Sequence, residues 1–299
     1  MLDGAGRLGH KAGMDDHSLP IVRTVAALRG HTSLWREKGQ TIALVPTMGA
    51  LHTGHMSLIQ MARAQADRVV CSVFVNPRQF GQNEDLDTYP RDEAGDARQL
   101  AQAHCDLMYA PTAAEMYPAG FSTSINVGGV SEGLCGESRP HHFGGVATVV
   151  AKLLIQAGPD VAIFGEKDFQ QLMVIRRLAR DLDLHVEILG APIARDRDGL
   201  ALSSRNAYLS ADERATAGRL NVILAEGAKA LKAGRGVAGL EADLKDALHS
   251  AGFPEIDYVE TRAADDLSRL GPGPVAKPAR LLAAVWLGRT RLIDNVAVG

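Results

Sequence analysis

The chain has 299 residues, of which 46% are hydrophobic and 22% charged, and its formal net charge is −3. This balance is typical of an ordinary globular protein and gives no sign of a polyanionic partner or a membrane surface, so we expect binding to neither nucleic acid nor lipid. No apolar run approaches the ~20 residues that are needed to cross a bilayer. The length allows one large domain and, more readily, two.

The N-terminal segment, residues 1–19, contains Gly, Asp and His but no apolar core. It lacks the pattern of a secretory signal, and we expect a disordered leader. The cysteines, Cys71, Cys105 and Cys135, are odd in number and far apart, without a Cys-x-x-Cys pair. Such spacing predicts reduced, buried thiols and a cytoplasmic location.

Short apolar segments alternate with amphipathic ones through the first two thirds of the chain. The expected strands are 41–46, 69–75, 107–110, 161–164 and 186–189, and the expected helices are 56–66, 91–103, 146–157 and 169–182. Strands that alternate with helices in this way form an α/β fold with a parallel sheet and helices on both faces. Ligands of such folds bind beyond the carboxyl ends of the strands.

The pattern changes near residue 192. Helices are expected at 211–233 and 239–249, then strands at 256–260, 281–287 and 290–293, with the Gly- and Pro-rich run 271–278 as a surface turn between two of them. We expect a smaller α+β domain here. The predicted organisation is a leader (1–19), a nucleotide- and substrate-binding domain (20–192) and a C-terminal domain (193–299).

The most informative motif joins the first of these strands to the first helix and contains His52 and His55 in His-x-Gly-His spacing. Glycines let the backbone approach a ligand, and a strand-to-helix turn aims free N–H groups and the positive end of a helix dipole at it. Imidazoles there can donate hydrogen bonds to phosphate oxygens. Since no Gly-x-x-x-x-Gly-Lys-Ser/Thr loop occurs, the motif favours a nucleotide site that handles the triphosphate through histidines.

Two other interpretations of these histidines stay open. They can be polar loop residues, one of them a helix cap, or they can bind zinc. The zinc interpretation is weak because the i, i+4 spacing and the adjacent Glu of helical zinc proteases are missing.

A second turn between a strand and a helix occurs at Gly165–Gln171. Asp168 and Gln171 have the spacing of a capping box, which is a structural role. Capping does not explain Lys167, a cation at the carboxyl end of a strand, where it can bind phosphate as a point charge. Taken alone, the motif favours neither role.

A third run places Ser203, Ser204 and Arg205 after a small-residue turn. Out of context, a Ser/Asn turn with a solvated arginine explains these residues. Their position at the predicted domain junction favours a clamp for phosphate oxygens, because clefts between domains hold ligands.

Two polar loops carry weaker signals. Asn76 and Gln79 can hydrogen-bond a hydroxyl or a carboxylate, or Asn76 can simply begin an Asn-Pro turn. The glycine-containing loop 137–145 includes His141 and His142, which face either a cleft or solvent.

Taken together, these segments closely resemble the pantothenate synthetase (pantoate–β-alanine ligase) family of the His-x-Gly-His nucleotidyltransferase superfamily. No single motif carries the resemblance; the ordered set does, from about residue 21 to the end of the chain. The matching segments are 46–55, 74–77, 79–80, 89–91, 165–171, 198–206, 257–260 and 286–295.

The resemblance implies a Rossmann-like nucleotidyltransferase domain, a C-terminal lid domain and a homodimer. It also implies ATP and Mg²⁺ and a reaction in two steps. The carboxylate of pantoate attacks the α-phosphorus of ATP, which gives pantoyl adenylate and pyrophosphate, and the amine of β-alanine then displaces AMP. Positioning and charge stabilisation would lower the barrier without a covalent nucleophile.

The resemblance further implies roles for single residues. His52, His55 and Lys167 would hold the phosphates, with His55 as the proton donor. Gln79 and Gln171 would bind pantoate, and Gln79 would also contact β-alanine. The side chains of Ser203, Ser204 and Arg205 would close on the β- and γ-phosphates. The implied ATP contacts are Met48, Gly49, Ala50, Leu51, His52, Thr53, Gly54, His55, Gly165, Glu166, Lys167, Asp168, Ala194, Leu202, Ser203, Ser204 and Arg205; the Mg²⁺ ligands stay unknown.

Three positions depart from the family pattern. Arg78 stands where an apolar residue, often Met, is usual; turned inward it adds positive charge beside the carboxylate substrate, and turned outward it changes nothing. Gly144 stands where a bulkier residue, often Arg, is usual, which makes the adjacent histidine loop the least transferable part. Thr53 replaces an acidic residue that merely separates the two motif histidines.

Two rival functions remain. One is a nucleotidyltransferase of the same superfamily that transfers AMP to a phosphate, which predicts ATP turnover without dependence on pantoate. The other is a non-enzymatic nucleotide-binding or regulatory protein, which predicts ATP binding without pyrophosphate release. Loss of His55, Lys167 or Arg205 would favour the second rival, and all three are present.

Overall fold

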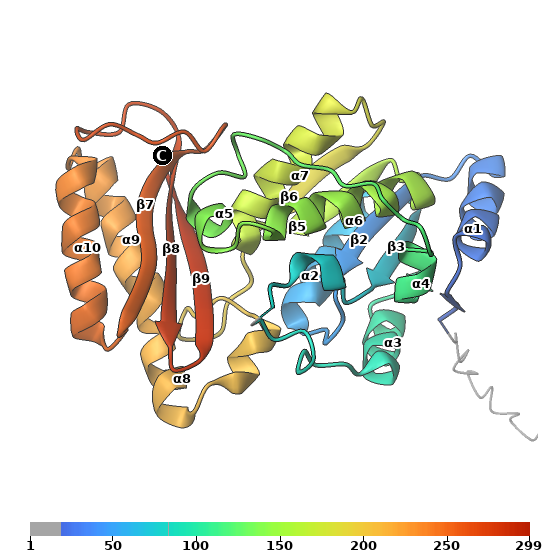
Figure 1. Ribbon diagram of the computed structural model, residues 1–299, viewed down its shortest axis with the longest axis horizontal. Helices are drawn as coiled ribbons and strands as arrows, with labels where there is room; N and C mark the ends of the chain where they lie inside the picture. Colours follow the sequence, from blue (N-terminus) through green and yellow to red (C-terminus); the bar gives the residue numbers. More distant parts are fainter. Residues whose placement is uncertain (1–18, 83) are drawn as a thin grey trace, which may run out of the picture.

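The structure, a computed structural model, describes residues 19–82 and 84–299. The expected leader lies outside the described residues, except for Leu19. The described chain forms two units that lie side by side (Figure 1): a six-stranded sheet with helices on both faces, and a three-stranded sheet with its own helices. None of the helices in this part of the chain is long and apolar enough to span a membrane.

The larger sheet is parallel and is built around β2 (Ile42–Thr47). β2 pairs with β3 on one side and with β5 on the other. The chain thus winds outward from β2 in one direction and then crosses to the opposite side, so the carboxyl ends of β2 and β5 flank the crevice where α/β folds bind ligands. The strand order is β1-β4-β3-β2-β5-β6, with β1 (Ile21–Val22), β3 (Arg68–Val73), β4 (Leu107–Tyr109), β5 (Val161–Gly165) and β6 (Glu187–Ala191).

Apolar layers cover both faces of this sheet. Helices α2 (Thr53–Gln65) and α3 (Glu93–Gln102) share a core with Ala43 and Val45. Helices α1 (Val25–Glu37), α6 (His142–Ala157) and α7 (Phe169–Asp181) share the opposite core with Ile42 and Leu44. Because successive strand side chains point to opposite faces, the continuous apolar run of β2 supplies both layers.

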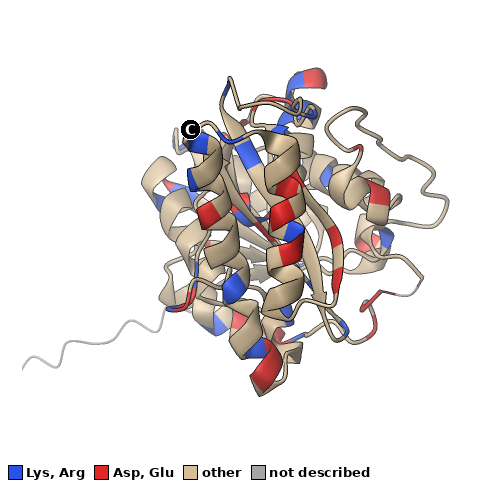
Figure 2. Ribbon diagram, turned by 90° about the vertical axis from the view of Figure 1, so that its left-hand side faces the viewer, with Lys and Arg blue, Asp and Glu red and all other residues tan. Residues whose placement is uncertain are grey.

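The second unit is an antiparallel sheet of β7 (Glu255–Ala263), β8 (Ala279–Leu287) and β9 (Thr290–Val298). Helices α9 (Arg219–Lys232) and α10 (Val237–Ala251) pack on one face. The other face contributes Tyr258, Leu282 and Ala284 to the core of the first unit. Figure 2 views this unit from the side of α9 and α10, where acidic and basic residues are interspersed.

The expected parallel α/β fold and the smaller C-terminal unit are confirmed, with the ends of several elements shifted. The single helix expected at 211–233 is wrong. α8 (Ala211–Ala217) ends at Ala217 and α9 begins at Arg219, so Gly218 caps both helices. The Asp198 carboxylate lies 2.5 Å from the position of a Cβ on Gly218 and pairs with Arg214 of α8, so this side chain occupies the bend.

Several elements lie in segments for which the sequence predicted no structure. They are β1, α1, α4 (Ala113–Met116) and α5 (Leu134–Ser138). A domain boundary at residue 192 stays a prediction; the segment that follows β6 runs along the cavity described next.

Candidate active site

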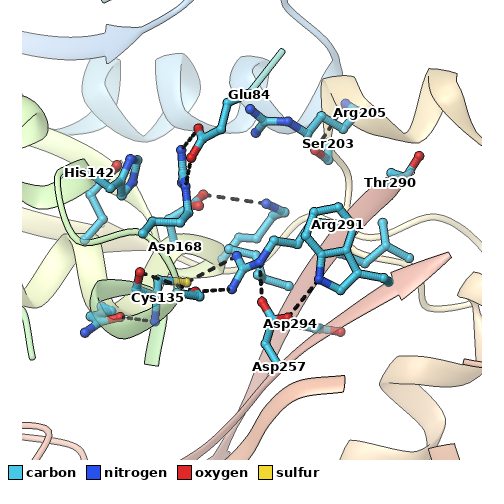
Figure 3. Close-up of a pocket in the computed structure, with 18 of the residues that line it drawn as sticks. Glu84, Cys135, His142, Asp168, Ser203, Arg205, Asp257, Thr290, Arg291 and Asp294 are labelled. Atoms are coloured by element: carbon cyan, nitrogen blue, oxygen red, sulfur yellow. Dashed lines mark hydrogen bonds and ion pairs between the residues drawn. The ribbon is translucent and has the colours of Figure 1, made fainter. Parts of the chain in front are cut away.

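Two adjoining cavities lie at the carboxyl ends of β2 and β5. The smaller one, of about 240 Å³, is lined by the first unit and the segment after β6. The larger one, of about 810 Å³, lies between the two units, where Glu84, His142 and Asp168 face Thr290 and Arg291 of β9 (Figure 3). The cavities share Arg139, His142, Lys167, Asp168, Gln171, Ser203 and Arg205.

The small cavity brings together most of the side chains that the sequence predicted. These are Met48, His52, Gly54, His55, Gln79, Gly165, Lys167, Asp168, Gln171, Ala194, Leu202, Ser203, Ser204 and Arg205. They come from the ends of β2 and β5, from the loop after β3 and from the segment after β6. Convergence of four separate segments on one cavity is the arrangement that a binding site needs.

His52 and His55 form a capping box at the start of α2. His52 Nδ1 accepts a hydrogen bond from the N–H of Gly54 (3.1 Å), and His55 Nδ1 accepts one from the N–H of His52 (3.3 Å). The ring centroids are 4.1 Å apart. Since both Nδ1 atoms act as acceptors, these bonds assign the proton of each neutral ring to Nε2. The helix-cap interpretation is therefore correct, and it leaves the Nε2–H groups available to a ligand.

Burial keeps these imidazoles neutral. It lowers the pKa of His52 to about 4, with a further contribution from the positive charge of Lys167. Burial also lowers the pKa of His55 to about 3, assisted by His52 and Lys167. At pH 7 both rings are thus neutral donors beside a lysine, which suits an anionic ligand.

A buried carboxylate shapes the turn before the histidines. Asp96 accepts hydrogen bonds from the N–H groups of Ala50 (3.0 Å) and Leu51 (2.7 Å), and it is 2% exposed. Gly49 has φ +83°, and a Cβ there would approach Asp96 Oδ2 at 2.9 Å. Gly49, Ala50, Leu51 and Thr53 are predicted ATP contacts that do not line the small cavity. For these four the ATP contact stays a prediction.

The turn after β5 presents Lys167. Its Nζ lies 3.7 Å from Asp168 Oδ2. The capping-box interpretation of Asp168 and Gln171, one of the two left open by the sequence, is wrong, because Asp168 makes no side-chain cap bond to α7. A short 3-10 turn, Glu166–Asp168, runs directly into α7 and places the carboxylate beside the lysine. Gln171 instead lines both cavities.

The neighbouring glutamine has a different task. The Nε2 of Gln170 donates to the carbonyl oxygens of Val130 (3.2 Å) and Gly133 (3.1 Å), and its Oε1 accepts from the N–H of Cys135 (3.0 Å). Gln170 therefore holds the loop that precedes α5.

The last strand fixes the lysine turn from the second unit. The Nδ2 of Asn295 donates to the carbonyl oxygens of Glu166 (2.9 Å) and Lys167 (3.0 Å). Arg280 donates to Asn295 Oδ1 (2.8 Å) and to the Glu166 carboxylate (3.0 Å). Glu166, a predicted ATP contact, lines neither cavity, and for it that contact stays a prediction.

A plain surface turn would leave Arg205 without a protein partner, but in the structure Arg205 is partly buried and forms an ion pair. Its Nε and Nη2 donate to the two carboxylate oxygens of Asp85 at 2.9 and 2.8 Å. Burial raises the pKa of the Asp85 carboxyl, but its bonds to Arg205 outweigh burial and lower that pKa below the ordinary value. Ser203 accepts from the N–H of Arg205 (3.3 Å), and Ser204 Oγ lies 3.3 Å from the hydroxyl of Tyr89.

The sequence left the role of the 137–145 loop open. In the structure, Arg139 and His142 of this loop line both cavities. His142 Nδ1 lies 3.0 Å from the carbonyl oxygen of Gln79, and burial lowers the pKa of His142 to about 4. Arg139, which was not predicted as a site residue, pairs with Glu84 (2.8 Å). The sequence did contain a signal for these residues: the polar loop leads directly into the apolar helix α6, which indicates that the loop lies near the core.

Gln79 reaches the small cavity, whereas Arg78 does not. Gln79 Nε2 lies 3.1 Å from Met48 Sδ. The guanidinium of Arg78 lies over the rings of Tyr117 and Phe121, 5.4 Å from each centroid, and lines neither cavity. Of the two expectations for Arg78, the outward one is correct.

Comparison with known proteins identifies a family for this chain. The profile of the family described as pantoate-beta-alanine ligase matches residues 20–297. The pantothenate synthetase of Caulobacter vibrioides is 60% identical over 280 residues, which are 93% of this chain and 98% of the relative. That of Rhodospirillum rubrum is 56% identical, over 94% of this chain and 99% of the relative.

Solved structures are similar as well. The crystal structure of pantothenate synthetase from Thermus thermophilus matches with a TM-score of 0.87 and 43% identity, over 94% of this chain and 99% of that one. A pantoate-beta-alanine ligase of Francisella tularensis, complexed with beta-gamma ATP and beta-alanine, matches with a TM-score of 0.77 and 33% identity, over 93% and 97%.

Proposed function

The chain belongs to the pantoate–β-alanine ligase family, and from this premise we propose that its cavity condenses pantoate with β-alanine in a reaction driven by ATP. A carboxylate oxygen of pantoate forms a bond to the α-phosphorus, and the bond to pyrophosphate breaks. The amine nitrogen of β-alanine then bonds to the acyl carbon of pantoyl adenylate. AMP leaves with the bridging oxygen, and the amine releases a proton.

One observation supports this function above the others. His52 and His55 follow β2, Lys167 follows β5 and Arg205 follows β6, yet all four line a single cavity that also holds Gln79. The first four suit the phosphates of a nucleotide, and the amide suits a small hydroxy acid.

We propose that the histidines act through Nε2–H. Both donors are oriented before a ligand binds, because the Nδ1 atoms are held by the backbone of α2. Such donors stabilise the pentacovalent transition state, where negative charge on the phosphate oxygens increases, and Lys167 and Arg205 add fixed positive charge. The family resemblance gives His55 as the proton donor. Because burial lowers its pKa to about 3, the ring is neutral at pH 7, and we propose that its Nε2–H donates a hydrogen bond to the phosphate without transferring the proton.

We propose that Gln79 and Gln171 bind pantoate, with Gln79 also near β-alanine. The adenosine would lie along Gly165, Ala194 and Leu202, which border the same cavity. The larger cavity between the units adjoins this position, and its volume of about 810 Å³ gives space for the second substrate. The order of the two steps follows from their chemistry, because the amine attacks an acyl carbon that is activated only once the adenylate has formed.

Mg²⁺ belongs to the proposal as a companion of ATP. Among residues 19–82 and 84–299, no group of three or more His, Cys, Asp and Glu side chains is placed to hold a metal ion. Mg²⁺ commonly binds through substrate phosphates and only one or two carboxylates, and the Asp168 carboxylate, which lines both cavities, fits that need. When bound, the ion would neutralise phosphate charge.

We also propose a homodimer in the cytoplasm. The dimer rests on the family resemblance alone, and light scattering coupled to size exclusion tests it. The location is supported by Cys71, Cys105 and Cys135, which are all buried and free.

A pyrophosphate-release assay with each substrate omitted in turn tests the function. We expect release that requires ATP and pantoate, with AMP and the amide appearing only after β-alanine is added. Release that ignores pantoate would favour transfer of AMP to another acceptor. ATP binding without any release would favour a non-enzymatic nucleotide-binding protein.

A further inference from the structure

Tyr117 lines neither cavity, but its hydroxyl is bonded to a residue that does. Tyr117 is the C-cap residue of α4, and its hydroxyl donates a hydrogen bond to Asn76 Oδ1 at 2.7 Å. Asn76 borders the small cavity and is 1% exposed. The N–H of Arg78 donates to the same Oδ1 at 3.3 Å.

These bonds determine which way the amide of Asn76 faces. With Oδ1 accepting from Tyr117 and Arg78, its Nδ2 donates to Gln79 Oε1 (2.9 Å) and to the carbonyl oxygen of Gly145 (3.2 Å). A reversed amide would place its oxygen against the Gly145 carbonyl and its NH₂ against the N–H of Arg78. The observed orientation satisfies every partner, and a buried amide without its partners would be strongly destabilising.

The orientation of the Asn76 amide in turn determines that of the Gln79 amide. Because Oε1 of Gln79 is occupied by Asn76, its Nε2 is the end that faces the cavity, 3.1 Å from Met48 Sδ. A thioether is a weak acceptor, so these N–H groups can turn to a stronger one. The side chain therefore offers donors to a hydroxyl or carboxylate oxygen.

Close packing leaves this arrangement little freedom. A Cβ on Gly145 would collide with the carbonyl oxygen of Arg78, so only glycine lets α6 approach the loop this closely. The Tyr117 ring packs against Phe74 and Phe121, with ring centroids 6.3 and 5.1 Å away. Burial raises the pKa of Tyr117 to about 12, so the phenol stays a donor at pH 7.

We propose that Tyr117 is a positioning residue for pantoate, which acts through Asn76 to keep the amide of Gln79 with its NH₂ toward the substrate oxygens. The proposal rests on the proposed role of Gln79 in binding pantoate. Tyr117 itself contacts neither the substrate nor the reacting atoms.

The test is Tyr117→Phe, which keeps the ring and removes the hydroxyl. We expect the KM for pantoate to rise about threefold to tenfold, the effect of one misdirected hydrogen bond. The KM for ATP and kcat stay within about twofold, because the loss is confined to pantoate binding. Tyr109→Phe is the matched control: it removes a buried hydroxyl that donates to Gln156 Oε1 (3.2 Å) away from both cavities.

A double-mutant cycle with Gln79→Ala makes the test specific. If Tyr117 acts through Gln79, then Tyr117→Phe has no further effect on the pantoate KM once Gln79 is Ala. An unchanged pantoate KM in Tyr117→Phe overturns the proposal. So does an equal increase in Tyr109→Phe or in the KM for ATP, or full additivity in the cycle. Failure of the proposed function is seen separately, as pyrophosphate release by the unmodified protein that does not depend on pantoate.

Discussion

The side-chain amide of Asn295 donates a 3.0 Å hydrogen bond to the carbonyl oxygen of Lys167. The two residues are 128 positions apart and belong to different units. The last strand of the chain therefore helps to hold the cation that follows β5. Any movement of the second unit as a lid must either carry the lysine turn with it or break these bonds.

Asn295→Ala should weaken catalysis through that turn. We expect kcat/KM for ATP to fall about tenfold or more, since small displacements of a positioned group cost that much. Steady-state pyrophosphate release measures the loss. Thr261→Val serves as the control in the same sheet, because the buried Thr261 hydroxyl has no hydrogen-bond partner in the described part of the chain. Full activity in Asn295→Ala would contradict a role in holding Lys167.

Two substitutions of His55 separate its structural and chemical roles. Asn can replace Nδ1 as the acceptor from the N–H of His52 but has no counterpart of Nε2. We expect His55→Asn to retain thermal stability and lose about 10²–10³-fold in adenylation rate. His55→Ala should lose the rate and, in addition, about 1 kcal/mol of stability from the broken cap. Thermal unfolding and pyrophosphate release provide the two measurements; near-normal turnover in either variant would remove the histidine from its proposed role.

The buried histidines make stability depend on pH. Burial lowers the pKa of His142 to about 4 from the ordinary 6.5. Between these values the unfolded chain binds a proton that the folded chain does not, so the free energy of unfolding decreases as pH falls from 6.5 toward 4. His142→Asn, which keeps a donor for the Gln79 carbonyl, should show a shallower decline. Urea unfolding at several pH values measures both slopes, and equal slopes would contradict the assignment.

We expect Asp85 to compete with the ATP phosphates for Arg205. The carboxylate accepts from Nε and Nη2, which form one of the two-pronged donor edges of the guanidinium that would clamp ATP. We expect Asp85→Asn to lower the KM for ATP about twofold to fivefold, consistent with a partly exposed ion pair worth ~1 kcal/mol or less. Glu93→Gln, which removes the exposed pair with Arg23, is the control. A higher KM for ATP would mean that Asp85 orients Arg205 instead of restraining it.

Local patterns predicted much of the fold and the site. Apolar runs of β-branched residues located the parallel strands, and Gly turns after them located His52, His55 and Lys167. These features depend on residues that are neighbours in the chain. The family resemblance then placed Arg205 and Gln79 on the same cavity, where the structure has them.

Long-range pairings could not be predicted in this way. Nothing near Asn295 indicates that its amide binds carbonyls 128 positions away, and nothing near Tyr117 indicates its bond to Asn76. Asp168 shows the opposite failure: its spacing to Gln171 matches a capping box, but a 3-10 turn redirects the carboxylate. Local spacing alone does not determine which partner a polar side chain takes.

The apolar face of the three-stranded sheet that meets the first unit has a practical consequence. Expressing the region after residue 192 as a separate fragment would uncover Tyr258, Leu282 and Ala284, which are all buried in the intact chain. A fragment with such a face is prone to self-association. Screening or labelling experiments should therefore use the intact chain, because separating the two units would expose the core that they share.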